Sequence, residues 1–318
     1  MYNISDRKNN EEFLMENIFI TKIHIDKVRN LKKFNIALSE TERKHLVLTG
    51  KNGSGKTSLL EEMKDYIEIF LEPVKEYEDG TWGYKEKQGT KKFFNTLSVS
   101  FNDVFQLEKL KTYIPSKRML DMDVPKSIEK IDIKDNPSIN ENLSRDFLKY
   151  IIYLDYQLLR AKNDENKQRL QKWFDRFESM LKDLYNCPGL HLEPIPDDLI
   201  FKIKMPGIEM FGLNEMADGY AAIFNIITEL MLRMDDGNAV VDMDLPGIAF
   251  IDEIEAHLHI GLQKKVFPFL TAMFPNIQFI VSTHSPFVLG SIGDALVFDL
   301  EKKRRIEDIA AYSKELIE

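Results

Sequence analysis

Gly50-Lys-Asn-Gly-Ser-Gly-Lys-Thr-Ser58 has the residue spacing of a phosphate-binding loop, and it directly follows an apolar segment that ends at Thr49. Glycines let backbone N–H groups turn inward around phosphate oxygens, the lysine reaches the β and γ phosphates, and the threonine hydroxyl binds Mg²⁺. The bare pattern should arise by chance in a chain of this length about one time in a hundred. The stretch therefore predicts a nucleoside triphosphate site, with Lys56 on the phosphates and Thr57 on the metal, rather than a glycine-rich turn without a ligand. The other expected nucleotide-binding residues of the loop are Asn52, Gly53, Ser54, Gly55 and Ser58.

The composition of the 318 residues, 43% hydrophobic and 30% charged, is that of a globular protein with one large domain or two small ones. A single cysteine, Cys187, excludes an intramolecular disulfide framework and a zinc site built from cysteines, which fits a reducing cytoplasm. There is no run of the ~18 apolar residues that a membrane span needs, and the polar start lacks a signal-peptide core. A net charge of −9 argues against strong nonspecific attraction to nucleic acid. The basic run from Lys302 to Arg305 is interpreted as a solvated turn or helix start.

Alternating apolar and polar residues predict strands on both sides of the loop, and a long helix directly after it. Residues 1–15 are expected to form a disordered leader. The helix is expected from Thr57 to about Leu71, and the charged, glycine-containing segment Glu76 to Gly89 is expected to be a loop. The expected strands are Ile18–Val28, Phe34–Leu38, His45–Thr49, Phe93–Phe101 and Leu110–Ile114.

Residues Ser138 to Asn186 have a different pattern, in which apolar residues recur at helical spacing on two successive segments. They predict two amphipathic helices joined by a polar turn at Lys162–Asn166, each reaching only ~30 Å. We interpret this hairpin as an insertion whose apolar stripe packs in a small core of its own, with partner binding as the alternative. Further strands are expected at Leu190–Glu193 and Leu199–Met205, and a helix at Gly219–Met234.

Two carboxylates follow a buried strand in the C-terminal half of the chain. Gly247-Ile-Ala-Phe-Ile is continuously apolar, as in a central parallel strand, and ends at Asp252 and Glu253. A phosphate loop needs a second anchor for the metal and a base for the attacking water. We predict that Asp252 holds Mg²⁺ and that Glu253, which points elsewhere, is the general base. Acidic turn residues without catalytic function are the alternative interpretation.

A further apolar strand, Ile277–Thr283, ends at His284. A histidine at this strand end can hydrogen-bond the γ phosphate and sense hydrolysis. The spacing from Glu253 leaves room for one helix and a return strand, which is one right-handed crossover, so the two strand ends should meet on the same sheet edge. His284 is therefore the second predicted catalytic residue.

In their order along the chain, these motifs resemble the ABC-type ATPase superfamily, specifically the branch that includes chromosome-structure, DNA-repair and OLD-like nucleotide-binding domains. That family has a phosphate loop, a signature motif, an aspartate-glutamate strand end, a D-loop and a switch histidine. The residues of the later motifs look like those of ATPases in prokaryotic anti-phage modules, of the Septu, retron-associated and PARIS types. In this chain the motifs read Gly50–Ser58, Met216-Ala-Asp-Gly-Tyr220, Phe250-Ile-Asp-Glu253, Glu255-Ala-His-Leu-His259 and Ser282-Thr-His-Ser-Pro286.

The resemblance implies an α/β fold, a P-loop NTPase of ABC-ATPase type. Its mixed β-sheet is flanked by helices, with an antiparallel β subdomain and the helical hairpin as an insertion. We expect a single ABC-type ATPase domain over residues 16–318. Its parts would be an N-terminal lobe (16–120), the helical insertion (121–190) and a C-terminal lobe (191–318).

The mechanism implied by the family is hydrolysis of ATP, with Mg²⁺, in a head-to-tail homodimer around two ATP molecules. Each ATP lies between the phosphate loop of one subunit and the signature motif of the other. Ala217, Asp218 and Gly219 then contact nucleotide at a helix N-terminus, which is an anion site on physical grounds as well. Arg29 and Asn30 occupy the place where related ATPases contact the base or the α phosphate.

The chain departs from the family pattern at several positions. Ala217 stands where the signature usually has a serine, so the hydroxyl contact to the γ phosphate is absent, which favours slow hydrolysis or an ATP-held state. Where the family carries a glutamine, this chain has Pro-Ser-Lys-Arg118, and Arg118 is either a phosphate or partner contact or a plain surface residue. Ile260 replaces a frequent proline. His257 and His259 are placed in the D-loop at a dimer seam, with a metal pair as the alternative.

The chain ends shortly after His284 with no nuclease domain, so any destructive activity is expected from another polypeptide. We expect an effector nuclease encoded nearby, controlled by this cytoplasmic ATPase as a nucleotide-dependent dimerising switch in anti-phage defence. No membrane contact is expected, and direct nucleic-acid binding is left open. The alternatives are a DNA-repair or DNA-end-binding ATPase, the ATPase subunit of a membrane transporter, and a nucleotide-binding scaffold that barely hydrolyses.

Overall fold

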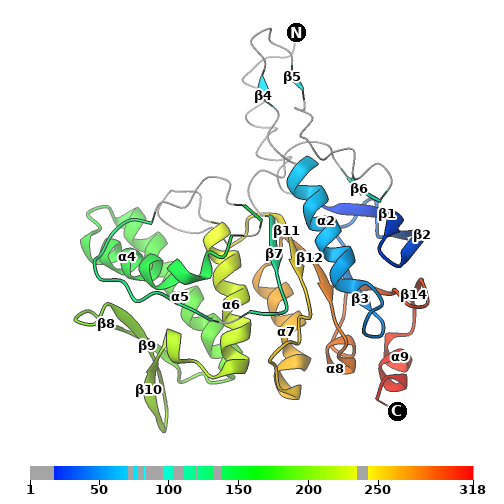
Figure 1. Ribbon diagram of the computed structural model, residues 1–318. Coiled ribbons are helices and arrows are strands. Elements are labelled where there is room, and N and C mark those ends of the chain that lie inside the picture. Colours follow the sequence, from blue (N-terminus) through cyan, green and yellow to red (C-terminus); the bar gives the residue numbers. More distant parts are fainter. Residues whose placement is uncertain are drawn as a thin grey trace.

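The centre of the molecule is a six-stranded sheet with the strand order β14-β13-β3-β12-β11-β7 (Figure 1). Neighbouring strands are parallel, except that β14 pairs antiparallel with β13 at one edge. The strands are β3 (His45–Thr49), β7 (Lys111–Ile114), β11 (Gly247–Ile251), β12 (Ile277–Ser282), β13 (Ala295–Asp299) and β14 (Arg304–Ile306). This computed structural model describes residues 18–70, 75–76, 82–83, 96–102, 111–118, 120–131, 138–139, 141–234 and 243–317, so the predicted leader lies outside the described residues.

The central strands are mostly apolar because both faces of the sheet are covered. Every residue of β11 and of β12 is buried. The helix α7 (Ile260–Met273) leads from β11 to β12, which lies beside β11 in parallel register. The predicted helix and return strand after the two carboxylates are thus confirmed, and the carboxyl ends of β3, β11 and β12 meet at one edge of the sheet.

One face of the sheet packs on the first long helix, α2 (Lys56–Phe70). Alternate side chains of the strands, such as Leu46, Leu48 and Phe250, point to this face and join the core around α2. The other side of α2 contacts a second sheet, which is antiparallel with the order β2-β1-β6. Its strands, β1 (Ile20–Val28), β2 (Leu31–Ala37) and β6 (Leu97–Phe101), lie close to the predicted positions.

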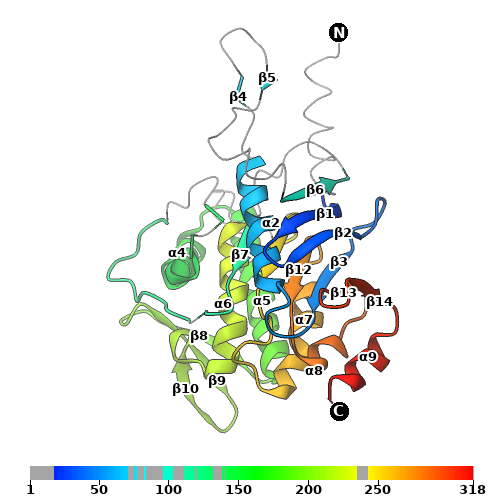
Figure 2. The ribbon, with the colours of Figure 1, turned by 45° about the vertical axis from the view of Figure 1, so that its right-hand side comes forward.

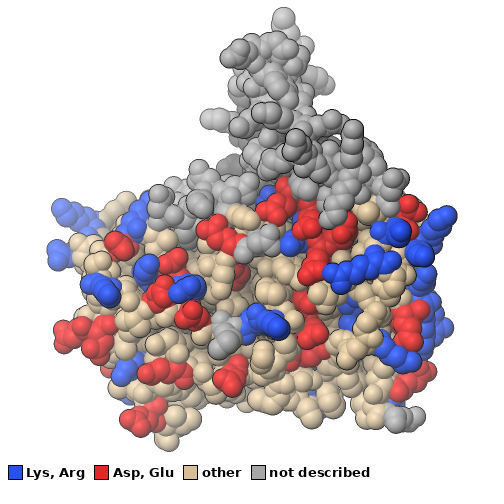
Figure 3. All heavy atoms as spheres, viewed as in Figure 1, with Lys and Arg blue, Asp and Glu red and all other residues tan. Residues whose placement is uncertain are grey.

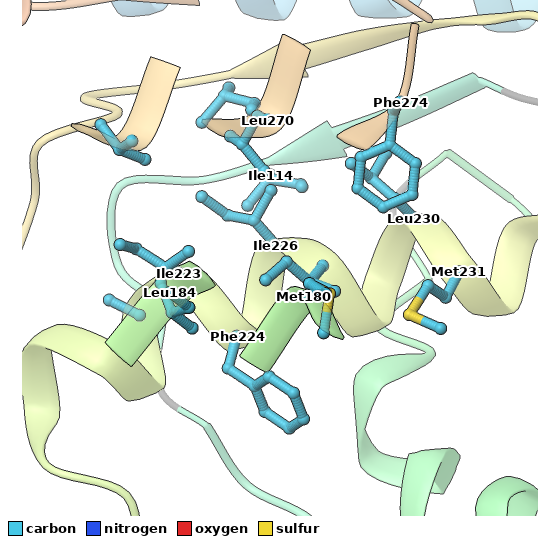
Figure 4. Packing of buried hydrophobic residues seen from close by; sticks show 14 of the residues in the cluster. Ile114, Met180, Leu184, Ile223, Phe224, Ile226, Leu230, Met231, Leu270 and Phe274 are labelled. Atoms are coloured by element: carbon cyan, nitrogen blue, oxygen red, sulfur yellow. The ribbon is translucent and has the colours of Figure 1, made fainter. Parts of the chain in front are cut away.

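The opposite face packs on helices, among them the predicted hairpin formed by α4 (Phe147–Arg160) and α5 (Asp164–Tyr185). We had predicted that the apolar stripe of this hairpin packs in a small core of its own, and that prediction was wrong. The stripe belongs to one continuous core with α6 (Asp218–Arg233), α7 and the sheet. Figure 4 shows Ile226 of α6 directed toward Ile114 and Leu270, with Met180 and Leu184 of α5 against the same helix. The hairpin prediction was right in its helices and wrong in their packing.

A third sheet, antiparallel with the order β10-β9-β8, follows the hairpin in sequence and lies beside it in both ribbon views (Figures 1 and 2). It contains β8 (His191–Ile195), β9 (Ile200–Met205) and β10 (Ile208–Gly212), the last of which was not predicted. Shorter elements connect the rest. They are β4 (Lys75–Glu76) and β5 (Trp82–Gly83), which fall in or beside the predicted loop, η2 (Ser144–Asp146), η3 (Leu213–Glu215), α8 (Pro286–Leu289) and α9 (Ile309–Glu315).

A buried ion pair fastens α6 to the sheet. Arg233 Nε lies 2.7 Å from Glu229 Oε1, and both side chains are almost completely buried. The Arg233 guanidinium also donates to the carbonyl oxygen of Lys111 on β7, while Glu229 Oε2 accepts from the backbone N–H of Leu143 and Ser144. The pair therefore ties together the helix that begins at the signature motif, the edge strand and the segment leading into α4.

Charges of both signs are interspersed on the face shown in Figure 3, with basic side chains gathered toward the edge where β2 and β14 lie. The basic run Lys302–Arg305 is part of this edge. It forms the turn between β13 and β14 and the start of β14, and its residues are exposed. Arg305 pairs with Glu307, and Lys302 lies 3.8 Å from Glu315. The interpretation of this run as a solvated turn is confirmed.

Candidate nucleotide-binding site

The phosphate loop joins the end of β3 to the start of α2. Gly53 and Gly55 have φ of +80° and +100°, a backbone conformation that residues with a Cβ rarely adopt, and a Cβ on Gly55 would lie 3.1 Å from Leu31 Cδ1. The side chain of Lys56 folds back over the loop, where its Nζ donates to the carbonyl oxygens of Gly50 at 2.7 Å and Lys51 at 3.1 Å. Burial lowers the pKa of Lys56, an effect opposed by nearby carboxylates. The loop thus has the glycine geometry and the lysine position that phosphate binding needs.

Thr57 and Asp252 lie in contact although they are far apart in sequence. The Thr57 hydroxyl is 2.9 Å from Asp252 Oδ2, and Ser282 Oγ donates to Asp252 Oδ1 at 2.6 Å. Asp252 is only 2% exposed, and the hydroxyl of Thr57 lies at the first turn of α2. A hydroxyl and a carboxylate are the oxygen ligands that Mg²⁺ takes beside a nucleotide, so this pair fits the ion. Ser282, which was not predicted, orients the carboxylate from the end of β12.

Glu253 follows Asp252 but turns away from it, because its backbone has a φ of +45°. Its N–H donates to Ser282 Oγ at 2.8 Å, and its side chain is 42% exposed. His284, at the end of the neighbouring strand, places Nε2 3.8 Å from Glu253 Oε1. The structure therefore brings together the two predicted catalytic side chains near the phosphate loop, and the carboxylate of Glu253 is partly exposed to solvent.

Glu255 is a further carboxylate in this site, and no role was predicted for it beyond its place in the D-loop motif. Its Oε1 accepts from the backbone N–H of His284. Its Oε2 is buried and has no hydrogen-bond partner among the residues that the structure describes. The sequence carried one signal for this contact, since Glu255 follows one parallel strand and His284 the next. Both must therefore lie at the same sheet edge.

Arg118 was interpreted either as a phosphate or partner contact or as a plain surface residue. Both interpretations were wrong, because the side chain of Arg118 is buried inside the chain and bound to backbone carbonyl groups. It is 5% exposed, and its guanidinium donates to the carbonyl oxygens of Asp252, Glu253 and Ile254 at 3.0, 2.8 and 3.0 Å. Burial lowers the pKa of Arg118 to about 10. Arg118 therefore packs against the backbone of the two acidic residues. The sequence gives no sign that a charged side chain is buried at this place.

The signature residues lie at the start of α6, where Ala217 and Asp218 are exposed. Ala217 is the N-cap and gives no side-chain cap, and Asp218 begins the helix. Gly219 lies against the D-loop, because a Cβ there would be 3.1 Å from Leu262 Cδ1 and 3.5 Å from the carbonyl oxygen of His257. His259 packs edge-on against Tyr220. In the part of the chain that the structure describes, no group of three or more His, Cys, Asp or Glu side chains has the arrangement of a metal site.

Asn30 and Arg29 lie on the other side of the phosphate loop, in the turn between β1 and β2. Asn30 Nδ2 lies 3.3 Å from the carbonyl oxygen of Gly53, and its Oδ1 is next to Gly55. Arg29 is exposed and lies 3.7 Å from Glu61 of α2. The turn therefore borders the loop, with Asn30 in contact and Arg29 farther out.

The chain is similar to several known proteins. Residues 137–290, just under half of the chain, match the family described as "AAA domain, putative AbiEii toxin, Type IV TA system". The chain is 28% identical to the Septu protein PtuA of Bacillus mycoides, over 96% of this chain and 43% of that protein. It is 32% identical to the Retron Ec83 probable ATPase of Escherichia coli over 41% of this chain and 24% of that protein. The Retron Vc95 probable ATPase of Vibrio cholerae is 25% identical over 69% and 42%. The chain spans less than half the length of these curated relatives.

Among solved structures, the SMC head domain from Thermotoga maritima is similar over 88% of this chain and 94% of that chain, with 14% identity and a TM-score of 0.44. The strand order, the loop after β3 and the acidic strand end after β11 are those of the predicted α/β fold of P-loop, ABC-ATPase type. The relatives confirm the resemblance to the ATPases of Septu and retron systems. In the described ranges, none of the helices is both long and apolar enough to cross a membrane.

Proposed function

We propose that the chain binds ATP with Mg²⁺ and hydrolyses it. The observation that carries this proposal is the contact between Thr57 and Asp252, 2.9 Å apart, with Glu253 and His284 directly beside it. These groups come from three separate strand ends and lie close together, which supports the proposal. A phosphate-binding turn without catalytic function does not require the carboxylates or the histidine.

In this proposal each side chain has a separate role in binding or hydrolysing ATP. Lys56 moves from the loop carbonyls to the β and γ phosphates, and Thr57 and Asp252 hold Mg²⁺, which when bound neutralises the phosphate charge. Glu253, with its open carboxylate, accepts a proton from the attacking water. His284 contacts the γ phosphate and changes its hydrogen bond when that phosphate leaves.

The test compares turnover and binding in two variants. Lys56→Ala should abolish ATP binding, whereas Glu253→Gln should bind ATP normally and lose turnover by about a hundredfold or more. Lys314→Ala and Glu315→Gln alter exposed residues of α9 and serve as matched controls that should behave as wild type. Unchanged turnover in Lys56→Ala and Glu253→Gln would overturn the catalytic assignment.

The wider role that we propose is a nucleotide-dependent dimerising switch in anti-phage defence. It is supported by the exposed start of α6, which presents Ala217 and Asp218 to a second molecule, and by the similarity to the Septu and retron ATPases. The switch would control a separate effector, a nuclease encoded nearby. Co-purification with the products of neighbouring genes tests the effector, and full anti-phage activity of the chain alone would refute it.

A second candidate is a scaffold that holds ATP and barely hydrolyses it, which Ala217 favours. Its backbone has the extended conformation of an N-cap, but its methyl group offers no hydroxyl to a phosphate or to the helix. Ala217→Ser should then raise turnover severalfold while leaving ATP affinity similar. An unchanged, wild-type rate in this variant would show that the missing hydroxyl does not limit hydrolysis.

A further inference from the structure

The turn that carries the proposed base has a conformation that needs support. Glu253 lies at φ +45°, in the left-handed region that residues with a Cβ avoid. The turn is anchored on one side by β12, since the N–H of Glu253 donates to Ser282 Oγ and that of Ile254 to the Ser282 carbonyl. These bonds use the N–H groups of the turn. Of its carbonyl groups, that of Glu253 also accepts from the N–H of Ala256 at 2.8 Å, whereas those of Asp252 and Ile254 need other donors.

Arg118 satisfies those carbonyl groups. Its guanidinium donates to three successive carbonyl oxygens, those of Asp252, Glu253 and Ile254, within 3.0 Å. Three successive carbonyls can converge on one planar donor only if the chain turns sharply between them, which is the geometry that the positive φ of Glu253 produces. A guanidinium carries five N–H donors in a fixed fork, so a single side chain can match this arrangement.

The surroundings of Arg118 suit a positioning role better than a ligand contact. The side chain also donates to the carbonyl oxygen of Pro115, which stiffens its own loop after β7. Its two terminal nitrogens are occupied by backbone acceptors. Its Nε is buried without a partner among the described residues. Burial lowers the pKa of Arg118, and nearby carboxylates act in the opposite direction, Glu255 most strongly. The carboxylate of Glu255 also accepts from the backbone N–H of His284. The guanidinium is thus enclosed by the segments that hold both proposed catalytic side chains.

We propose that Arg118 is a positioning residue that fixes the backbone turn at Glu253 and thereby aims the carboxylate at the water attacking the γ phosphate. This inference rests on the proposed ATP hydrolysis for its catalytic consequence, but the hold on the turn is independent of it. Arg118 touches neither nucleotide nor metal in this scheme.

The experiment measures kinetics and backbone exchange on the full chain. Arg118→Met should lower kcat by about a hundredfold and leave ATP affinity within about threefold of wild type, because the phosphate loop is untouched. Arg118→Lys should recover part of kcat, since an ammonium group can serve some of the carbonyls. Lys117→Met removes a positive charge from an exposed position of the same loop and should behave as wild type.

Hydrogen–deuterium exchange provides the readout that does not depend on turnover. In Arg118→Met, the amides of Glu253, Ile254 and Ala256 should exchange faster, while those of α7 stay protected. Wild-type exchange at these amides, or ATP affinity falling as much as kcat, would overturn the proposal. If the methionine variant does not fold, the same two criteria are applied to Arg118→Lys. A wild-type chain that fails to hydrolyse ATP would refute the proposed function, and the exchange experiment would still decide whether Arg118 holds the turn.

Discussion

At the scale of single residues, Ser282 links the two acidic residues of the proposed site, because its hydroxyl donates to the Asp252 carboxylate and accepts from the backbone N–H of Glu253. Ser282→Ala removes both bonds and leaves the Glu253 N–H unsatisfied. We expect turnover to fall about tenfold, with a higher Mg²⁺ requirement, since the loss of a bond to a charged group costs about 1.5–3 kcal/mol. Steady-state ATPase assays over a magnesium titration measure this. Ser291→Ala, which removes a hydroxyl bonded only to the Val288 carbonyl, is the control, and equal rates in the two variants would contradict the prediction.

The residues of the proposed site that were predicted from sequence are those at strand ends. Lys56, Asp252 and His284 follow buried apolar runs, and parallel strands bring their carboxyl ends together, so the sequence was sufficient. Arg118 was missed because its partners are backbone carbonyls, which carry no residue-specific pattern. A buried arginine and an exposed arginine look alike in a polar segment such as Pro115–Arg118, and only the tertiary fold distinguishes them.

At the scale of secondary-structure elements, the Glu229–Arg233 pair decides how α6 sits on the sheet. Arg233→Met would leave the Glu229 carboxylate buried without its cation and the Lys111 carbonyl without its donor. We expect the free energy of unfolding to fall by about 3–5 kcal/mol, the usual cost of breaking a buried ion pair. Urea unfolding followed by circular dichroism measures it. Arg176→Met breaks an exposed pair with Asp244 and should cost less than about 1 kcal/mol, so similar losses in both variants would contradict the prediction.

A histidine at the start of β3 should make stability depend on pH. Burial, followed by the nearby charge of Arg43, lowers the pKa of His45 to about 4, and its Nδ1 accepts from the N–H of Phe279. The unfolded chain takes up the proton near the ordinary pKa of about 6.5. Stability from this residue is therefore complete above about pH 6.5 and falls as the pH drops toward 4, by at most about 3 kcal/mol.

Unfolding measured from pH 7 to 4 tests this window. His45→Asn, which keeps an acceptor for Phe279, should start less stable because it loses the contacts with Phe267 and Phe279, but its stability should fall less steeply with pH. His191→Asn changes an exposed histidine and should follow the wild-type slope. A wild-type slope in His45→Asn would assign the pH dependence to other groups.

Which elements could be predicted depends on where their partners lie in the sequence. The strands and helices themselves have local patterns, and these were found within a few residues of their observed ends. The packing of α4 and α5 was not predicted, because the partner of their stripe is α6, a helix that is buried along most of its length and whose position follows only from the sheet. β10 was missed because it is an edge strand with exposed residues such as Ile208 and Met210, which lack the alternation of a half-buried strand.

At the scale of the whole molecule, the two motifs that should contact one ATP belong to different layers. The phosphate loop opens α2, which packs on one face of the central sheet, and the signature opens α6, which packs in the core on the other face. The start of α6 is exposed, and so is Lys51 of the loop. The separation supports a site completed by a second copy of the chain, with two such sites in a head-to-tail dimer.

Mixing two inactive variants tests this arrangement. Lys56→Ala disables the phosphate loop, and Ala217→Glu sets a negative charge at the exposed residue where the signature should meet the γ phosphate. Each alone should be inactive, but in a mixed dimer the loop of the second variant faces the intact signature of the first. An equal mixture should regain about a quarter of wild-type turnover, because half of the dimers are mixed and one of their two sites is intact.

The matched control for the mixture combines Lys56→Ala with Glu253→Gln, in which both defects lie in the same half of the site. Every mixed dimer then contains two damaged sites, so no activity should return. Recovery in this control would place the base and the phosphate loop in different halves. If mixtures with Ala217→Glu dimerise by light scattering but recover no activity, either the signature does not complete a neighbour's site or both sites must be intact for either to act.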